Sequence, residues 1–274
     1  MFTKYLIVAS KKDKAGVNIT TTLSQFRPNP VIASMKESPV FDIYVEDEEI
    51  IYTESLDLSR IRKYDFIIFA SRHQSKSGEK TLSIHTPGNF SDAQYGGVKG
   101  KICPASAIFQ KQMFENLHKL VKEYDLSGYS ITLEATHHGP LIDKPCLFIE
   151  IGSGETEWAD RRAAFVIAKT ISDTINNFKH NQYNEVAIAI GGPHYCPGFN
   201  SLQLESNLAI SHIIPNYISP ITESMIKEAI NKTAEEIDFA IIDWKGLKAE
   251  ERANVVEILE KNYINWKKTS DIEN

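Results

Sequence analysis

Short and continuous apolar runs recur along the chain and predict buried β-strands. A strand buried on both faces is apolar throughout, whereas a half-exposed strand alternates apolar and polar residues. Residues 130–136, SITLEAT, alternate and predict a strand with one wetter face, and residues 41–54 predict a hairpin that turns through the acids at 46–48. Five runs have the continuous form: 5–9, 66–70, 147–151, 186–190 and 239–242.

Apolar residues recur at helical spacing between these runs. The pattern is clearest over 157–178, and it also predicts helices over 107–122, 221–236 and 247–262. Strands that alternate with helices are typical of an α/β fold, in which helices flank a mainly parallel or mixed central sheet. Segment 71–106 has no clear period and is rich in Ser, Gly and His. We therefore expect it to be irregular and to contribute to an active site.

Length and composition are those of a soluble globular protein. The chain has 274 residues, of which 42% are hydrophobic and 24% are charged. This length accommodates one large α/β domain or two modest ones. We expect a single α/β hydrolase domain over 1–274, with 41–54 and 71–106 as insertions and a frayed tail at 267–274. No apolar run approaches the roughly 20 residues of a membrane-spanning helix, so no membrane partner is expected.

Cysteine usage and charge add two further expectations. Cys103, Cys146 and Cys196 form no CxxC pair, which favours a reducing, cytoplasmic location. The net charge of −6 argues against a uniformly basic surface. Basic residues nevertheless gather over 99–122 and over 60–72. One such cluster is most simply a solvated face, but two can outline a footprint for a polyanion.

Polar residues follow the predicted strands directly. The carboxyl ends of parallel strands meet at one edge of the sheet, where ligands bind in open α/β folds. For a single segment, a turn or a capping role is the simpler interpretation. Three histidine-containing segments together favour an enzyme: Ser71-Arg72-His73, His137-His138-Gly139-Pro140 and Gly191-Gly192-Pro193-His194.

The adjacent pair His137-His138 lies where the alternating strand ends. On extended geometry Glu134, Thr136 and His138 share one face, and His137 points to the other. The Gly-Pro that follows lets the chain bend and direct an imidazole into a cleft. This geometry favours His138 over His137 for chemistry.

Two chemistries suit these residues. In the first, a zinc ion is held by His138, His194 and Glu134, with Cys196 or Glu150 as alternative ligands, and activates a water. In the second, a histidine is the general base, and backbone N–H groups of the glycines at 191–192 or 152–154 bind the oxyanion.

Several familiar motifs are absent from the sequence. There is no GxSxG elbow, so direct attack by water is favoured over a covalent acyl-enzyme. The sequence also has no GxxxxGK[ST] and no GxGxxG. Neither a nucleoside triphosphate nor a dinucleotide cofactor is therefore expected.

Four motifs together resemble the archaeal and plant type of D-aminoacyl-tRNA deacylase. They are SRHQSKSGEKTLSIHTPGN (71–89), EATHHGP (134–140), EIGSGETEW (150–158) and GGPHYCPGF (191–199), and their order and spacing match from the first strand to about residue 245. The resemblance implies hydrolysis of the ester between a D-amino acid and the 3′ end of tRNA. It also implies a zinc-dependent enzyme with a phosphorylase/hydrolase-like fold akin to peptidyl-tRNA hydrolase.

The matched positions guide the assignment of roles. Gly198 stands where the family commonly has a basic residue; if that residue touches phosphate, RNA affinity here is either lower or supplied elsewhere. We assign catalysis to His138, His137, His194 and Glu134, with His138, His194 and Glu134 as metal ligands. We assign substrate binding to Ser71, Arg72, His73, His85, Gly191, Gly192 and Tyr195. We assign tRNA binding to Lys76, Lys99 and Lys101.

The sequence alone leaves two alternative functions open. A small-substrate peptidase or nucleoside phosphorylase on the same fold would use a similar cleft and ignore RNA. A non-catalytic RNA-binding module would need stacking aromatics among basic residues on a sheet face, and the buried strands do not show them. We expect a monomer, with a dimer as the alternative.

Overall fold

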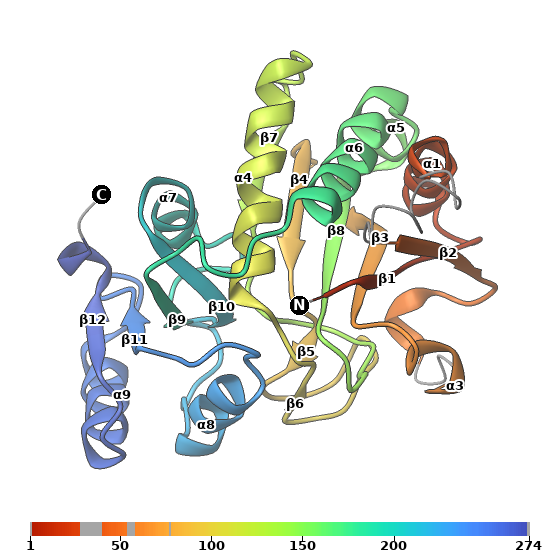
Figure 1. Ribbon diagram of the computed structural model, residues 1–274. Helices are drawn as coiled ribbons and strands as arrows, with labels where there is room; N and C mark the ends of the chain where they lie inside the picture. Colours follow the sequence, from red (N-terminus) through yellow and green to blue (C-terminus); the bar gives the residue numbers. More distant parts are fainter. Residues whose placement is uncertain (1, 28–39, 54–57, 77, 273–274) are drawn as a thin grey trace.

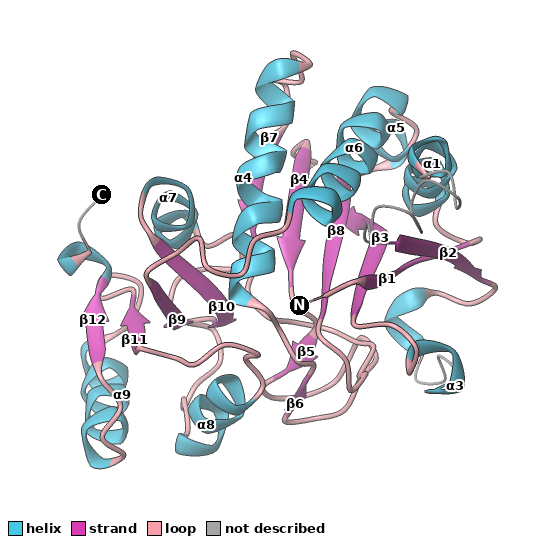
Figure 2. Cartoon of the chain, viewed as in Figure 1, coloured by secondary structure: helices cyan, strands magenta, loops and turns pink. Residues whose placement is uncertain are grey.

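A six-stranded mixed sheet forms the larger layer of the molecule (Figure 2). The computed structural model describes residues 2–27, 40–53, 58–76 and 78–272. Strand β4 runs antiparallel to β8, and the other neighbouring strands of this sheet are parallel. Their order across the sheet is β2 (Val40–Glu46), β1 (Lys4–Ser10), β3 (Phe66–Gln74), β8 (Cys146–Ser153), β4 (Thr81–His85) and β7 (Ser130–Leu133).

A second, parallel sheet lies beside the first. Its order is β10 (Leu208–Ile214), β9 (Glu185–Ile190), β11 (Phe239–Ile242) and β12 (Trp266–Lys268). A short antiparallel pair, β5 (Gly88–Asn89) with β6 (Lys101–Ile102), completes the described strands. The structure therefore has the α/β class and the mainly parallel sheet that the sequence predicts, but divides the strands between two main sheets.

Helices cover one face of the larger sheet (Figure 1). On that face α1 (Lys14–Leu23), α6 (Arg161–Asn177) and α4 (Ala107–Glu123) pack in a row, and α4 also contacts β10 of the second sheet. Successive side chains of a strand point to opposite faces of the sheet. On β1, Tyr5 and Ile7 face these helices, whereas Leu6 and Val8 belong to a hydrophobic cluster on the other face.

Other helices surround these layers, and no helix in the described ranges is long and apolar enough to cross a membrane. The remaining α-helices are α3 (Leu58–Ile61), α5 (Glu155–Trp158), α7 (Pro197–Glu205), α8 (Glu223–Asn231) and α9 (Ala249–Lys261). Short 3-10 turns occupy Ser24–Phe26, Ile50–Tyr52 and Thr269–Asp271.

Most elements predicted from hydrophobic pattern are confirmed. All five continuous apolar runs are strands, and SITLEAT contains β7. The helix predicted over 157–178 is interrupted, because α5 ends at Trp158 and Asp160 caps the start of α6. The helix predicted over 221–236 is shorter, as α8 ends at Asn231. Helices α1 and α7 and strand β10 were not predicted.

The hairpin predicted over 41–54 is wrong. Strand β2 is a single strand parallel to β1, and the chain then enters the 3-10 turn at Ile50–Tyr52; residue 54 lies outside the described residues. The acids do not form a hairpin turn. Asp47 and Glu48 instead pair with Lys11 and Lys12 after β1, at 2.6 and 2.5 Å.

Two further expectations about irregular structure are corrected. Segment 71–106 contains the end of β3 and all of β4, β5 and β6; its residue 77 is not described. Strand β4 is hidden in the sequence because its polar face, with Ser83 and His85, is as buried as Leu82 and Ile84. The tail is ordered rather than frayed up to residue 272, since β12 pairs with β11.

Asp160 offers a direct test of how α6 is fixed. One carboxylate oxygen accepts hydrogen bonds from the N–H groups of Arg162 and Ala163, at 2.8 and 3.3 Å, and the other accepts from the Tyr129 hydroxyl at 3.0 Å. We expect Asp160→Ala to lower the free energy of unfolding by about 1–2 kcal/mol, because a cap and a hydrogen bond are lost. Urea denaturation measures this, with Asp160→Asn as the control that keeps the cap. Equal losses in both variants would contradict the capping role.

Candidate active site

A cavity of about 650 Å³ opens where the carboxyl ends of β1, β3 and β8 meet the loops after β7 and β9. Parallel strands deliver side chains to this edge, as the sequence analysis expected. Its lining is strongly polar and includes four histidines. The lining residues are Ser10, Asp13, Glu49, Ile50, Ile51, Tyr52, Ser71, Arg72, His73, Gln74, Ser75, Lys76, Tyr95, His137, His138, Glu150 and His194.

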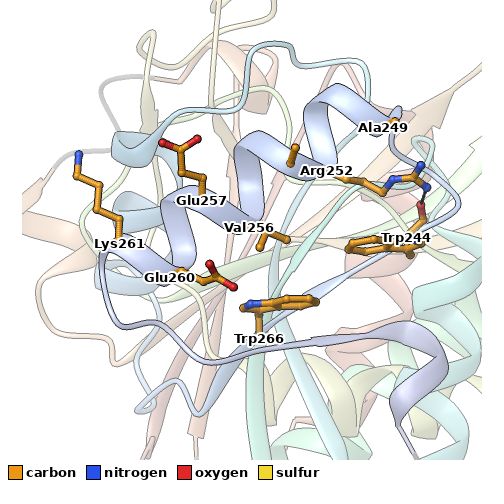
Figure 3. A pocket seen from close by; sticks show the side chains of 9 residues that line it. Trp244, Ala249, Arg252, Val256, Glu257, Glu260, Lys261 and Trp266 are labelled. Carbon is orange, nitrogen blue, oxygen red and sulfur yellow. Dashed lines mark hydrogen bonds between the residues drawn. The ribbon is translucent and has the colours of Figure 1, made fainter.

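A second hollow, of about 680 Å³, lies between α9 and the end of the second sheet. Trp244 and Trp266 form its floor with parallel rings 6.0 Å apart, and Val256 and Glu260 of α9 face them (Figure 3). No cluster of metal-ligating side chains found among the described residues belongs to it. The chemistry is therefore concentrated in the first cavity.

Glu134 carries a fully buried carboxylate behind the histidines that line the first cavity. Neither of its oxygens has the geometry of a hydrogen bond with any other residue that the structure describes. Three imidazoles lie close by: the nearest nitrogens of His73, His194 and His137 are 3.2, 3.3 and 3.5 Å away. Burial opposes the charge, but His194 and His73 outweigh it and hold the pKa of Glu134 below its ordinary value.

Glu150 is a second buried carboxylate beside the first. One of its oxygens lies 3.6 Å from His73 Nδ1 and 3.6 Å from His85 Nε2. Burial alone would lower the pKa of His73, yet Glu150 and Glu134 outweigh it and raise that pKa to about 10. The Tyr195 hydroxyl lies 2.9 Å from His73 Nε2. His73 is therefore an imidazolium at neutral pH, held between two carboxylates.

His137 and His138 are held in defined tautomers by the backbone. Their Nδ1 atoms lie 2.8 Å from the Ala135 carbonyl and 2.6 Å from the Gly139 carbonyl, and a carbonyl can only accept, so each Nδ1 carries the proton. Burial and then His85 lower the pKa of both, that of His138 to about 4. Each neutral ring therefore presents a free Nε2 lone pair, the form that binds metals.

The donor set fits a metal ion. Three overlapping groups each bring their ligand atoms within 4.8 Å of one another: Glu134 with His137 and His194, His73 with Glu134 and Glu150, and His85 with His137 and His138. A buried carboxylate without hydrogen bonds, beside the neutral imidazole of His137, is an arrangement that a divalent cation would satisfy.

The expected ligand set differs from this geometry at one position. His137, rather than His138, joins Glu134 and His194. The extended-strand argument fails because β7 ends at Leu133 and His138 has a left-handed backbone, with φ of 43°. The Cys196 sulfur contacts the carbonyls of Pro193 and His194 instead of the cluster.

Most residues assigned to substrate binding, and the lysines assigned to tRNA binding, fall into three places. Ser71, Arg72 and His73 line the cavity, as does Lys76. His85 lies behind it, stacked 5.1 Å from the Phe148 ring, and Tyr195 supports His73. Lys99 and Lys101 lie outside, paired with Asp92 at 2.8 Å and Glu228 at 3.9 Å.

Gly191 and Gly192 do not line the cavity. Both are buried and have positive φ, 99° and 79°, so they turn the chain between β9 and His194. The Gly191 N–H donates to the Ile214 carbonyl at 2.8 Å and is not free for an oxyanion. These glycines therefore lie in the turn that leads to His194, outside the cavity lining where substrate binding was expected.

Several cavity residues have no role assigned from the sequence, and they include Asp13, Glu49, Tyr52 and Tyr95. Asp13 caps α1 by accepting from Gly16 N–H at 3.0 Å and also accepts from Arg72 N–H at 2.7 Å. An Asp before a helical pattern is a recognisable cap signal in the sequence. The two tyrosines carry no local signal, because their position depends on long-range packing.

The fold and the cluster define an α/β protein with a buried histidine–carboxylate centre of the kind that holds a metal. The model of the D-aminoacyl-tRNA deacylase family matches residues 61–267. The D-aminoacyl-tRNA deacylase of Methanocaldococcus jannaschii is 33% identical over 273 residues, which cover 97% of this chain and 99% of that protein. The deacylase of Pyrococcus abyssi is 37% identical over 262 residues, covering 90% and 93%.

A solved structure has the same fold. It is described as a conserved protein of unknown function, and it superposes with a TM-score of 0.87 at 29% identity, covering 98% of this chain and 96% of the other. The chain belongs to the D-aminoacyl-tRNA deacylase family. The resemblance carried by the four sequence motifs is thereby confirmed.

Gly139 allows a test of the packing around the histidine turn. A Cβ added there would lie 2.4 Å from both Gly97 N and the Ile51 carbonyl oxygen, which are backbone atoms that cannot yield easily. We expect Gly139→Ala to lower the free energy of unfolding by about 1–3 kcal/mol through overpacking. Gly128→Ala is the control, because a Cβ at Gly128 meets nothing within 4 Å. Urea denaturation would contradict this packing if both variants were equally stable.

Proposed function

We propose that this chain hydrolyses the ester of D-aminoacyl-tRNA to free D-amino acid and tRNA, and that zinc at the histidine–carboxylate cluster supports the reaction. One observation carries the proposal: the buried Glu134 carboxylate lacks hydrogen bonds and faces three imidazoles that line an open cavity. Membership of the deacylase family favours this function over a small-substrate peptidase, a nucleoside phosphorylase or a non-catalytic RNA-binding module.

The ligand set that the geometry favours is Glu134, His137 and His194. Their oxygen and nitrogen donors suit zinc, and three protein ligands would leave one position open, as in catalytic zinc sites. When bound, zinc supplies Lewis-acid polarisation of a carbonyl and lowers the pKa of water. The Ala135 carbonyl, which accepts from His137 Nδ1 at 2.8 Å, orients that ligand.

The other residues supply charge and proton transfer. His73 lines the cavity with Nδ1 facing Glu134 and Glu150 and Nε2 2.9 Å from the Tyr195 hydroxyl, so its positive charge offsets the two carboxylates beside the ester. His138 is neutral, with Nδ1 held by the Gly139 carbonyl, and its Nε2 accepts a proton from the attacking water. An aminoacyl ester is activated enough that water can attack it without a covalent enzyme intermediate.

The substrate is a polyanion, although the chain carries a net charge of −6. Arg72 and Lys76 in the cavity, with Lys99 and Lys101 outside it, provide the local positive charge. The Lys99–Asp92 pair is exposed, and exposed ion pairs contribute little, so phosphate can replace Asp92 as the partner of Lys99. The three cysteines are free and buried, which fits a reducing, cytoplasmic setting.

Release of free amino acid from D-tyrosyl-tRNA and L-tyrosyl-tRNA tests the function. We expect the D-ester to be cleaved faster by roughly a hundredfold or more, because the cavity must hold one enantiomer in the reactive geometry. We also expect a chelator to abolish release and added zinc to restore it. If release persisted under chelation, the deacylase function would stand and the proposed role of zinc would be wrong. No release from either ester would contradict the proposed function.

A further inference from the structure

Two tyrosines at the mouth of the cavity are exposed, and no side-chain contact among the described residues holds their rings there. Tyr52 is 51% exposed and Tyr95 is 62% exposed, and both line the cavity with His137 and His138. Neither makes a ring contact or a side-chain hydrogen bond with any other described residue. Tyr217, by contrast, is exposed near the site but places its hydroxyl 3.3 Å from His194 Nδ1.

The backbone holds these two tyrosines beside the histidine turn. A Cβ at Gly96 would lie 1.7 Å from the Ile51 carbonyl oxygen, so only glycine lets the segment after Tyr95 contact the segment before Tyr52. The Tyr95 carbonyl accepts a hydrogen bond from the Gly139 N–H at 2.9 Å. The backbones of Tyr52 and Tyr95 are therefore fixed relative to His138, while their aromatic rings face solvent.

The position of the reacting ester determines what these rings meet. In an aminoacyl-tRNA the ester is on the ribose of the last, unpaired nucleotide, which is an adenosine. With the ester at His137, His138 and His194, which line the cavity, the attached base lies within one nucleotide of them, on the side of Tyr52 and Tyr95. Proteins bind unpaired bases by stacking them on exposed aromatic side chains. Lys76 lines the same cavity and can contact the neighbouring phosphate, whereas the Arg72 guanidinium is paired with Glu49 at 2.8 Å.

We infer that Tyr52 and Tyr95 form a stacking platform for the 3′-terminal adenine of the tRNA. This inference rests on the proposed function, since it places the nucleoside on one side of the ester that the cluster cleaves. The platform recognises a feature that every tRNA shares. It therefore contributes to binding whichever D-amino acid is attached.

Hydrolysis of three D-alanyl esters tests the platform: D-alanyl-tRNA, D-alanyl-adenosine and D-alanine ethyl ester. For each variant we compare kcat/KM for the adenosine ester with kcat/KM for the ethyl ester. We expect Tyr95→Ala to lower this ratio by roughly 5- to 150-fold, mainly by raising KM for the adenosine ester, because one stacked base contributes binding energy in that range. Tyr95→Phe keeps the ring and should retain most of the ratio. Tyr263→Ala removes a tyrosine that is 96% exposed on the C-terminal side of α9 and should leave the ratio unchanged.

Two outcomes would overturn the platform. An unchanged ratio in Tyr95→Ala and in Tyr52→Ala would show that neither ring binds the base. A loss seen with D-tyrosyl but not D-alanyl esters, and equal for the ethyl and adenosine esters, would assign the rings to the amino-acid side chain.

Binding of a short RNA separates this inference from the proposed function. Fluorescence anisotropy with labelled 5′-ACCA-3′ and 5′-ACC-3′ needs no hydrolysis. We expect the wild-type protein to prefer ACCA and Tyr95→Ala to lose that preference. If the protein cleaved no D-ester but kept a Tyr95-dependent preference, the function would fail and the platform would stand. Absence of the preference in the wild type would overturn the platform.

Discussion

The carboxylate of Glu134 is buried among imidazoles and accepts no hydrogen bond from another described residue. A charge in such a place is unfavourable unless it is neutralised by close partners. The two main sheets meet around it. Glu134 follows β7 of the larger sheet and His194 follows β9 of the smaller one. Backbone hydrogen bonds join the two sides, from Ala135 N–H to the His194 carbonyl at 2.9 Å and from Thr136 N–H to the Ile213 carbonyl at 3.0 Å.

This constraint explains the surrounding charges. His73 holds a proton between Glu134 and Glu150, which offsets part of the charge of the two carboxylates. His137 and His138 remain neutral, because burial and a neighbouring imidazole oppose their charged forms. The cluster therefore carries both an acid and lone-pair donors at neutral pH. Perturbed titration of this kind is typical of functional sites, where stability is lowered in exchange for reactivity.

The sequence predicted the fold where burial leaves a simple pattern. The continuous apolar runs became strands because both faces of β1, β3, β8, β9 and β11 are covered. Strand β4 gave no such signal, since its polar face is buried against the cluster rather than exposed. Strand β2 could not be distinguished from a hairpin, because its pairing with β1 is parallel and depends on segments distant in sequence.

The sequence indicated which residues form the candidate site better than it indicated how those residues are arranged. Histidines after strands marked the right edge of the sheet, and the structure gathers His73, His137, His138 and His194 there. The choice between His137 and His138 depended on extended geometry, which the left-handed backbone of His138 removes. The role of Gly191 depended on the carbonyl of Ile214, a partner that no local pattern reveals.

Calorimetric titration of the metal-free protein with zinc tests the central claim most directly. We expect the wild type to bind one zinc ion and Glu134→Gln to bind it at least about 10- to 100-fold more weakly, because a charged ligand becomes neutral. His118→Gln, which changes a histidine on α4 outside the cluster, should bind as the wild type does. Equal affinity in all three proteins would contradict the account of Glu134 as the carboxylate that holds the metal.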